Sequence, residues 1–163
     1  MRSFLYAVSL VLISATSFAQ ETVPLTSISE RAHLKVNAGG MFLSHGDDWS
    51  GASVGAVAGY NLHPKMSVAA GYDHGFAVRD GDGGIDVVRG WANFGITPSV
   101  YAGFGYARYA ESLEGGFAQL VLYRPIMSRF DLSLVYAHVF PRGEADDFEQ
   151  VRAVFSYHLL GKE

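Results

Sequence analysis

Five charged residues occur on faces that otherwise carry small or neutral polar side chains. They are Lys35, Asp73, Arg89, Asp131 and Arg152. Each lies in a segment of alternating polarity, on the face opposite the apolar residues, as do Asn37, Asn93 and Gln119. Charges of both signs that share an enclosed interior must pair, because an unpaired buried charge is very costly. We expect these residues to form a salt-bridged network that closes an interior. The alternative is a narrow polar pore in which they select the solute.

A second set of candidate ligands lies in the glycine-rich segment 80–86. Asp80, Asp82 and Asp86 offer carboxylate oxygens at spaced positions, as a calcium-binding loop would. The segment lacks the glycine at the sixth position and the acidic twelfth residue of an EF-hand. Glycine-rich acidic tips of this kind are common as plain turns, and a calcium site at these three aspartates is the alternative.

Catalytic chemistry has little support. A nucleophilic site needs a serine, a base and an orienting carboxylate that converge. Ser44 and His45, with Asp47 or Asp48, offer the nearest arrangement, but neighbouring residues on a strand end rarely point at each other. Nothing resembles a metal cluster or a phosphate-binding glycine loop. We therefore expect no enzymatic activity and no cofactor.

The elements that position these residues are eight segments, nearly all with period-two alternation, which predicts β-strands. They are residues 33–43, 52–62, 66–78, 85–96, 99–109, 116–123, 130–140 and 149–159. One face of each is apolar and aromatic, and the other is small or polar. Most of them approach the roughly 9–11 residues that a tilted membrane strand needs. A narrow eight-stranded lumen tolerates small residues best, so we expect the apolar faces to point outward.

The connections alternate in character along the chain. Links 62–65, 97–98 and 124–128 are short and contain proline, whereas the other four are longer and acidic. Eleven of the sixteen acidic residues thus fall at one end: Asp47, Asp48, Asp80, Asp82, Asp86, Glu111, Glu114, Glu144, Asp146, Asp147 and Glu149. Tight periplasmic turns and longer outer loops are the layout of an up-and-down membrane barrel.

Aromatic residues flank both sets of connections, which predicts two interfacial bands. Trp49, Tyr109, Phe140 and Phe148 flank the acidic loops, and Tyr60, Phe94, Tyr101, Tyr123 and Phe130 flank the short turns.

Residues 1–19 predict a cleavable signal peptide. Arg2 precedes an apolar run that is too short to span a bilayer, and Ser17-Phe18-Ala19 offers small residues where a signal peptidase cuts. Cleavage before Gln20 leaves 144 of the 163 residues, enough for one domain: a lead-in at 20–32 and a barrel at 33–160. The chain has no cysteine, and its 17% of charged residues is below the roughly 25% of soluble domains. An exported chain this apolar, with no membrane-spanning helix, favours a closed barrel.

In pattern and layout the predicted barrel resembles the small outer-membrane β-barrel family of OmpA-like, OmpX-like and opacity-type porin-like proteins. Repeated motifs such as Ala58-Gly59-Tyr60 carry the resemblance. Members end on an alternating aromatic strand that the barrel-assembly machinery reads. Phe155-x-Tyr157-x-Leu159 fits the alternation but departs from the usual Phe or Trp at its last position.

The predicted fold is thus an all-β, eight-stranded antiparallel up-and-down transmembrane β-barrel in the bacterial outer membrane. We expect a monomer with a structural or surface-interaction role and a plugged lumen. The expected partners are outer-membrane lipid and lipopolysaccharide, bridged by divalent cations, and the barrel-assembly machinery. The mild net charge of −4 gives no reason to expect nucleic acid. A narrow diffusion pore and a soluble periplasmic barrel for an apolar ligand are the alternatives.

Overall fold

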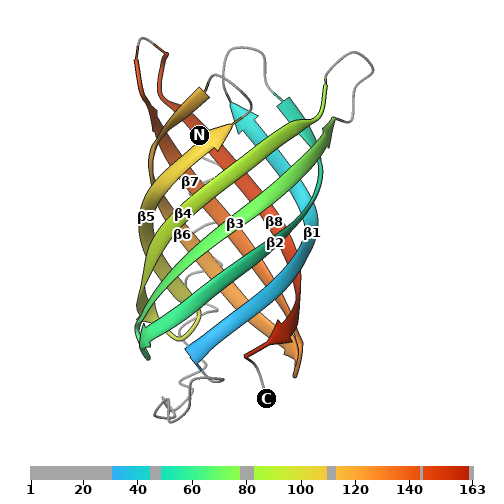
Figure 1. Ribbon diagram of the computed structural model, residues 1–163, viewed down its shortest axis with the longest axis vertical. Coiled ribbons are helices and arrows are strands. Elements are labelled where there is room, and N and C mark those ends of the chain that lie inside the picture. The colour runs from blue at the N-terminus through green and yellow to red at the C-terminus, as the bar shows by residue number, and fades with distance from the viewer. Residues whose placement is uncertain (1–30, 45–48, 78–82, 110–112, 144, 162–163) are drawn as a thin grey trace, which may run out of the picture.

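Eight antiparallel strands follow one another around a closed barrel in the computed structural model (Figure 1). The structure describes residues 31–44, 49–77, 83–109, 113–143 and 145–161. The strands are β1 (Ala32–Ser44), β2 (Trp49–His63), β3 (Met66–Ala77), β4 (Ile85–Thr97), β5 (Val100–Tyr109), β6 (Leu113–Met127), β7 (Phe130–Pro141) and β8 (Phe148–Leu160). The predicted fold class is confirmed. The predicted signal peptide and nearly all of the predicted lead-in lie outside the described residues.

The barrel closes through pairing of the first strand with the last. β1 pairs with β2 on one side and with β8 on the other, from Leu34 opposite Leu160 to Ser44 opposite Glu149. Both edges of the sheet are therefore hydrogen-bonded, as a strand wall in lipid requires. No helix among the described residues is long and apolar enough to cross a membrane.

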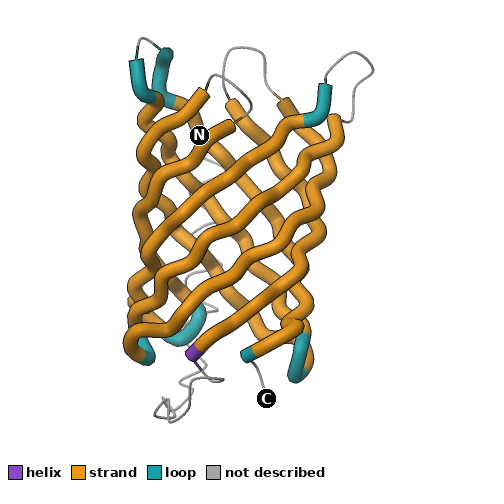
Figure 2. The backbone as a smooth tube through the Cα atoms, in the orientation of Figure 1, coloured by secondary structure: helices purple, strands orange, loops and turns teal. Residues whose placement is uncertain are grey.

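The three short turns share one construction, and all lie at the end where β1 begins and β8 ends (Figure 2). Each has two turn residues: Pro64 and Lys65, Pro98 and Ser99, and Ser128 and Arg129. The pairing register shifts just before each turn and leaves one aliphatic residue out of the ladder: Leu62, Ile96 or Ile126. All three side chains are exposed. A bulge before a tight turn increases the local twist that a narrow barrel needs.

Each turn is also hydrogen-bonded to the strand that follows its hairpin. The carbonyls of Lys65, Ser99 and Arg129 accept hydrogen bonds from backbone N–H groups of β4, β6 and β8, each at 2.8 Å. The donors are Gly95, Tyr123 and His158. The same bulge, turn and bond therefore recur three times around one rim.

The sequence-based boundary of the sixth strand is wrong. We expected residues 116–123 as the strand and 124–128 as a link, but β6 runs from Leu113 to Met127. The predicted link included Pro125. This proline lies instead where the register shifts, between Pro125 and Met127, which is where a sheet accommodates proline.

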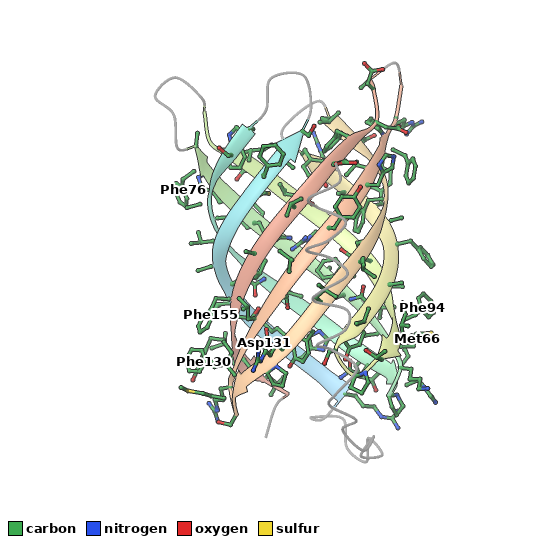
Figure 3. The ribbon with its side chains drawn as sticks, turned by 180° about the vertical axis from the view of Figure 1, so that it is seen from behind. Met66, Phe76, Phe94, Phe130, Asp131 and Phe155 are labelled. Atoms are coloured by element: carbon green, nitrogen blue, oxygen red, sulfur yellow. The ribbon has the colours of Figure 1, made fainter. Side chains whose placement is uncertain are left out.

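The apolar faces point outward, as expected. Figure 3 shows Phe76, Phe94, Phe130 and Phe155 along the outside of the wall, whereas Asp131 lies inside and is fully buried. Val54, Val88, Phe104, Leu134 and Leu159 are likewise among the exposed apolar residues of the wall. A soluble barrel would place its apolar faces inward, so the alternative of a soluble ligand carrier is wrong.

Glycine on the inward face reflects crowding in the lumen. A Cβ atom at Gly105 would clash with the backbone carbonyl oxygen of Gly90 on the neighbouring strand, and it would lie 2.7 Å from the Cβ of Trp91 and 2.8 Å from the Cζ of Phe117. Gly90, on the neighbouring strand, faces outward, and the nearest atom to a Cβ there is the carbonyl oxygen of Ala69 at 3.9 Å. Both glycines lie in the interior of a strand, so they differ in the space available for a side chain.

This difference predicts opposite outcomes for two alanine substitutions. Gly105→Ala forces atoms into a filled interior and is expected to destabilise the barrel by about 1–3 kcal/mol. Gly90→Ala adds a methyl group to open space and should cause no loss. Urea unfolding of both variants in the same lipid or detergent measures the difference. Equal stability of the two variants would contradict the crowded lumen.

Candidate functional site

The lumen contains two separate charge clusters, not one network. Asp73 on β3 lies between two arginines: Arg89 Nη2 is 2.8 Å from its Oδ2, and Arg152 Nη2 is 2.9 Å from its Oδ1. All three side chains are buried. Arg152 belongs to β8, so its bond to Asp73 crosses the lumen past β1 and β2. We call Asp73, Arg89 and Arg152 the arginine triad.

The second cluster centres on Asp131 of β7. Its Oδ2 lies 3.2 Å from Lys35 Nζ on β1 and is also bonded to Nε2 of His158 on β8. Asp131 and His158 are buried, while the Lys35 side chain keeps 20% of its surface exposed. The structure therefore pairs all five predicted charged residues. It adds His158, which alternates on the inward face of β8 with Arg152 and Ser156 and is buried.

Neutral polar residues bridge other parts of the lumen. Gln119 Nε2 donates to Asn93 Oδ1 at 2.8 Å. Tyr109 donates its hydroxyl to Gln150 Oε1 at 3.2 Å, and Gln150 Nε2 lies 3.0 Å from Met41 Sδ. The Arg89 guanidinium lies 4.8 Å from the ring centroid of Trp91, a distance at which cation–π attraction operates. These contacts fix side chains that would otherwise move within the lumen.

An apolar cluster fills the lumen at the end that carries the longer loops. Its buried members are Met41, Leu43, Val87, Ala107, Tyr109, Phe117, Ala137, Val139 and Phe148, with Trp49, Ile85, Trp91 and Leu113 packed against them. Tyr109 and Phe148 meet edge to face with centroids 5.2 Å apart. The expectation of a uniformly small and polar lumen is therefore wrong at this end. We call this group the apolar plug.

The plug corrects part of the predicted aromatic bands. Tyr109 and Phe148 point into the lumen and are 1% and 2% exposed, and Trp49 packs against them. Of the four aromatics expected to form the loop-side band, Phe140 alone is an exposed wall residue. At the other end, Tyr101 and Tyr123 also line the lumen. The alternation itself contained the signal, because Tyr109 and Phe148 share parity with inward-facing residues.

The Asp86 carboxylate contacts two side chains of the neighbouring strand β3. Its Oδ1 accepts a hydrogen bond from the Tyr72 hydroxyl at 2.6 Å and lies 2.7 Å from His74 Nδ1. Asp80 and Asp82, the other two predicted calcium ligands, lie outside the described residues, as do His45, Asp47 and Asp48. Within the described ranges, no group of three or more His, Cys, Asp or Glu could hold a metal ion.

The Asp86 contacts recur on the opposite side of the barrel. Tyr136 donates its hydroxyl to Glu149 Oε1 at 2.9 Å, and His138 Nε2 lies 3.4 Å from Asp147 Oδ2. Both sites use the same outward-facing spacing, Tyr-x-His-x-Phe, at residues 72–76 and 136–140. In each, the histidine ring packs against the phenylalanine, with centroids 4.6 and 4.7 Å apart. The sequence analysis did not identify this repeat. Its tyrosine and histidine side chains contact acidic side chains at the lipid-facing rim.

A cavity of about 320 Å³ lies in the half of the lumen that carries the short turns. Its lining extends from Asn61 and Gly161 at the turn end to Arg89 and Arg152 of the triad. Lys35 and His158 line it as well. The lumen thus has three levels: the apolar plug, the arginine triad and a polar cavity.

The geometry of the arginine triad predicts that its carboxylate stabilises the folded barrel. Asp73→Asn would leave two buried arginines without their carboxylate, and breaking a buried ion pair in this way costs about 3–5 kcal/mol. Asp147→Asn is the control, because Asp147 is exposed and its contact with His138 is long. We expect a large drop in the urea midpoint for the first variant and little change for the second. Similar midpoints for both would show that the triad does not stabilise the barrel.

Comparison with known proteins shows the fold. No family model and no curated protein matches the sequence. Among solved structures, Neisserial surface protein A aligns with a TM-score of 0.55 and 13% identity, over 77% of this chain and 96% of that one. A structure described as a de novo designed transmembrane β-barrel aligns with a TM-score of 0.50 and 15% identity, over 78% and 95%. At these identities the likeness shows that the chain has the fold of small transmembrane β-barrels.

Proposed function

We propose that this chain is an integral outer-membrane protein with a closed lumen, and that its role is structural or lies in contacts made at the cell surface. The apolar plug is the observation that carries the closure. Nine buried residues from six strands fill one end of the lumen, and Val87, Val139 and Tyr109 are at most 1% exposed. The arginine triad crosses the lumen at the next level. Water and solutes would have to displace both layers to pass.

The membrane location follows from the inverted distribution of polarity. Charged residues of both signs are buried inside, and large apolar residues cover the outside. The wall is a closed hydrogen-bonded ring without a free edge. Among spanning structures, only helices and closed barrels satisfy every backbone group in lipid. Barrels of this kind are typical of outer membranes.

A narrow diffusion pore is the second candidate, and the cavity is the observation that favours it. About 320 Å³ of the turn-side half is already empty of protein atoms. Open porins, however, use about 16–18 strands, and eight leave room only for side chains or one small ligand. Passage through this barrel would require the apolar plug to move.

Membrane insertion predicts a defined behaviour in fractionation. The full chain, expressed in a Gram-negative host, should sediment with outer membranes and need detergent for extraction. Its gel mobility should differ between heated and unheated samples, because the closed barrel resists unfolding by detergent alone. A protein that stays soluble without detergent and shows no heat-dependent shift would refute the membrane proposal.

Closure predicts that the wild-type protein gives no steady conductance in planar bilayers. Phe148→Ala, which removes a buried ring from the apolar plug, is expected to produce measurable leak events. Phe140→Ala removes a ring of the same size from the exposed wall and is the matched control, which should stay silent. A large steady conductance of the wild type would defeat the closed-lumen proposal and favour the pore.

A further inference from the structure

The arginine triad carries an excess positive charge inside the barrel. Asp73 contributes one negative charge, and Arg89 and Arg152 contribute two positive charges. In the second cluster, Lys35 already balances Asp131. Trp91, whose ring lies against the Arg89 guanidinium, is neutral. A net charge left in a buried site is costly unless something compensates it.

The same arginines hold unused hydrogen-bond donors. Among the described residues, Arg152 Nε and Nη1 and Arg89 Nε have no hydrogen-bond partner. Arg152 is 1% exposed and Arg89 is 8% exposed. Buried polar atoms are rarely left unpaired in native proteins, and a buried unpaired donor on a charged group is especially unfavourable. The excess charge and these free donors both favour an acceptor with a negative charge near the arginines, although Asp73 Oδ2 of the triad also has no hydrogen-bond donor.

The lining of the turn-side cavity fits such an acceptor. Both arginines line the cavity, but Asp73 and Asp131 do not. Its charged lining is basic: Lys35, Arg89 and Arg152. No carboxylate occurs among its described lining residues. Asn93 and Gln119 add neutral polar groups, and the cavity volume of about 320 Å³ suits a small ligand.

We propose that the turn-side cavity binds a small oxyanion, a carboxylate or a phosphate, against Arg152 and Arg89. The planar guanidinium matches the geometry of both anions, which accept two parallel hydrogen bonds from it. The bound anion neutralises the excess charge of the triad. Because the apolar plug fills the loop end, the anion enters from the turn end, past Asn61 and Gly161. The site does not depend on whether the barrel conducts, so binding and conductance test separate proposals.

Trp91 offers a direct readout, because it lines the cavity and stacks on Arg89. The chain has two tryptophans, so Trp49→Phe leaves Trp91 as the single tryptophan fluorophore. The full-length barrel carrying this substitution, refolded in detergent micelles, is titrated in separate arms with sodium phosphate, sodium acetate and sodium chloride at constant ionic strength. We expect a saturable fluorescence change with phosphate or acetate, and a matching rise in unfolding temperature, because a ligand that binds only the folded state stabilises it. The arm with the lower half-saturation concentration identifies the preferred oxyanion. No saturable change in either oxyanion arm, or a change equal to that in chloride, overturns the proposal.

Two variants and one control substitution then locate the site. Arg152→Lys keeps the positive charge but removes the guanidinium, and should raise the half-saturation concentration at least tenfold. Arg129→Lys makes the same change at an exposed turn residue and should leave it unaltered. Val135→Phe fills the cavity without changing any charge and should abolish the response even if Arg152→Lys fails to fold. Heat-dependent gel mobility identifies the variants that fold. Unchanged binding in a folded Arg152→Lys or Val135→Phe variant overturns the proposal.

Discussion

The antiparallel pairing of β1 with β8 is the interaction on which the rest of the structure depends. It satisfies the last free backbone groups of the sheet, and it fixes which residues of every strand face the lumen. Because side chains alternate strictly along a strand, a shift of one residue in any pair would turn apolar side chains inward and charges outward. The three identical bulged turns and their carbonyl bonds hold this register at one rim. The closed ring therefore determines both the lipid-facing surface and the composition of the lumen.

Much of this could be predicted from alternation alone. The number of strands, their order and their outward faces follow from period-two patterns with proline-containing or acidic links between them. Alternation also placed Asp73, Arg89 and Arg152 on inward faces. It failed at Pro125, which the prediction assigned to a short proline-containing link but which lies in β6 beside a local bulge. Alternation also indicates that Tyr109 and Phe148 face inward. Their place near strand ends nevertheless led to the prediction that they face lipid.

The pairing of charges inside the lumen could not be read from the sequence. Arg152 meets Asp73 across 79 residues of chain, and Asp131 meets Lys35 across 96. These partners depend on the depth of each residue along the barrel, which is set by the stagger between strands and not by strand order. Sequence reasoning gave one network of five charges, whereas depth divides them into two clusters at different levels. His158 joins the Asp131 cluster because the strand stagger places it at the same depth.

The lumen is polar at one end only, and this asymmetry constrains what the protein can do. A barrel filled with salt bridges throughout would be stabilised by charge pairing alone, and a barrel filled with apolar side chains would need no charges. Here the apolar plug occupies the loop end, so the triad is screened from water on that side and meets a polar cavity on the other. A charge in such a position interacts strongly with any ion that enters the cavity, since the low polarity of the plug weakens screening. The two arginines therefore line a cavity in the turn-side half of the barrel, away from the apolar plug.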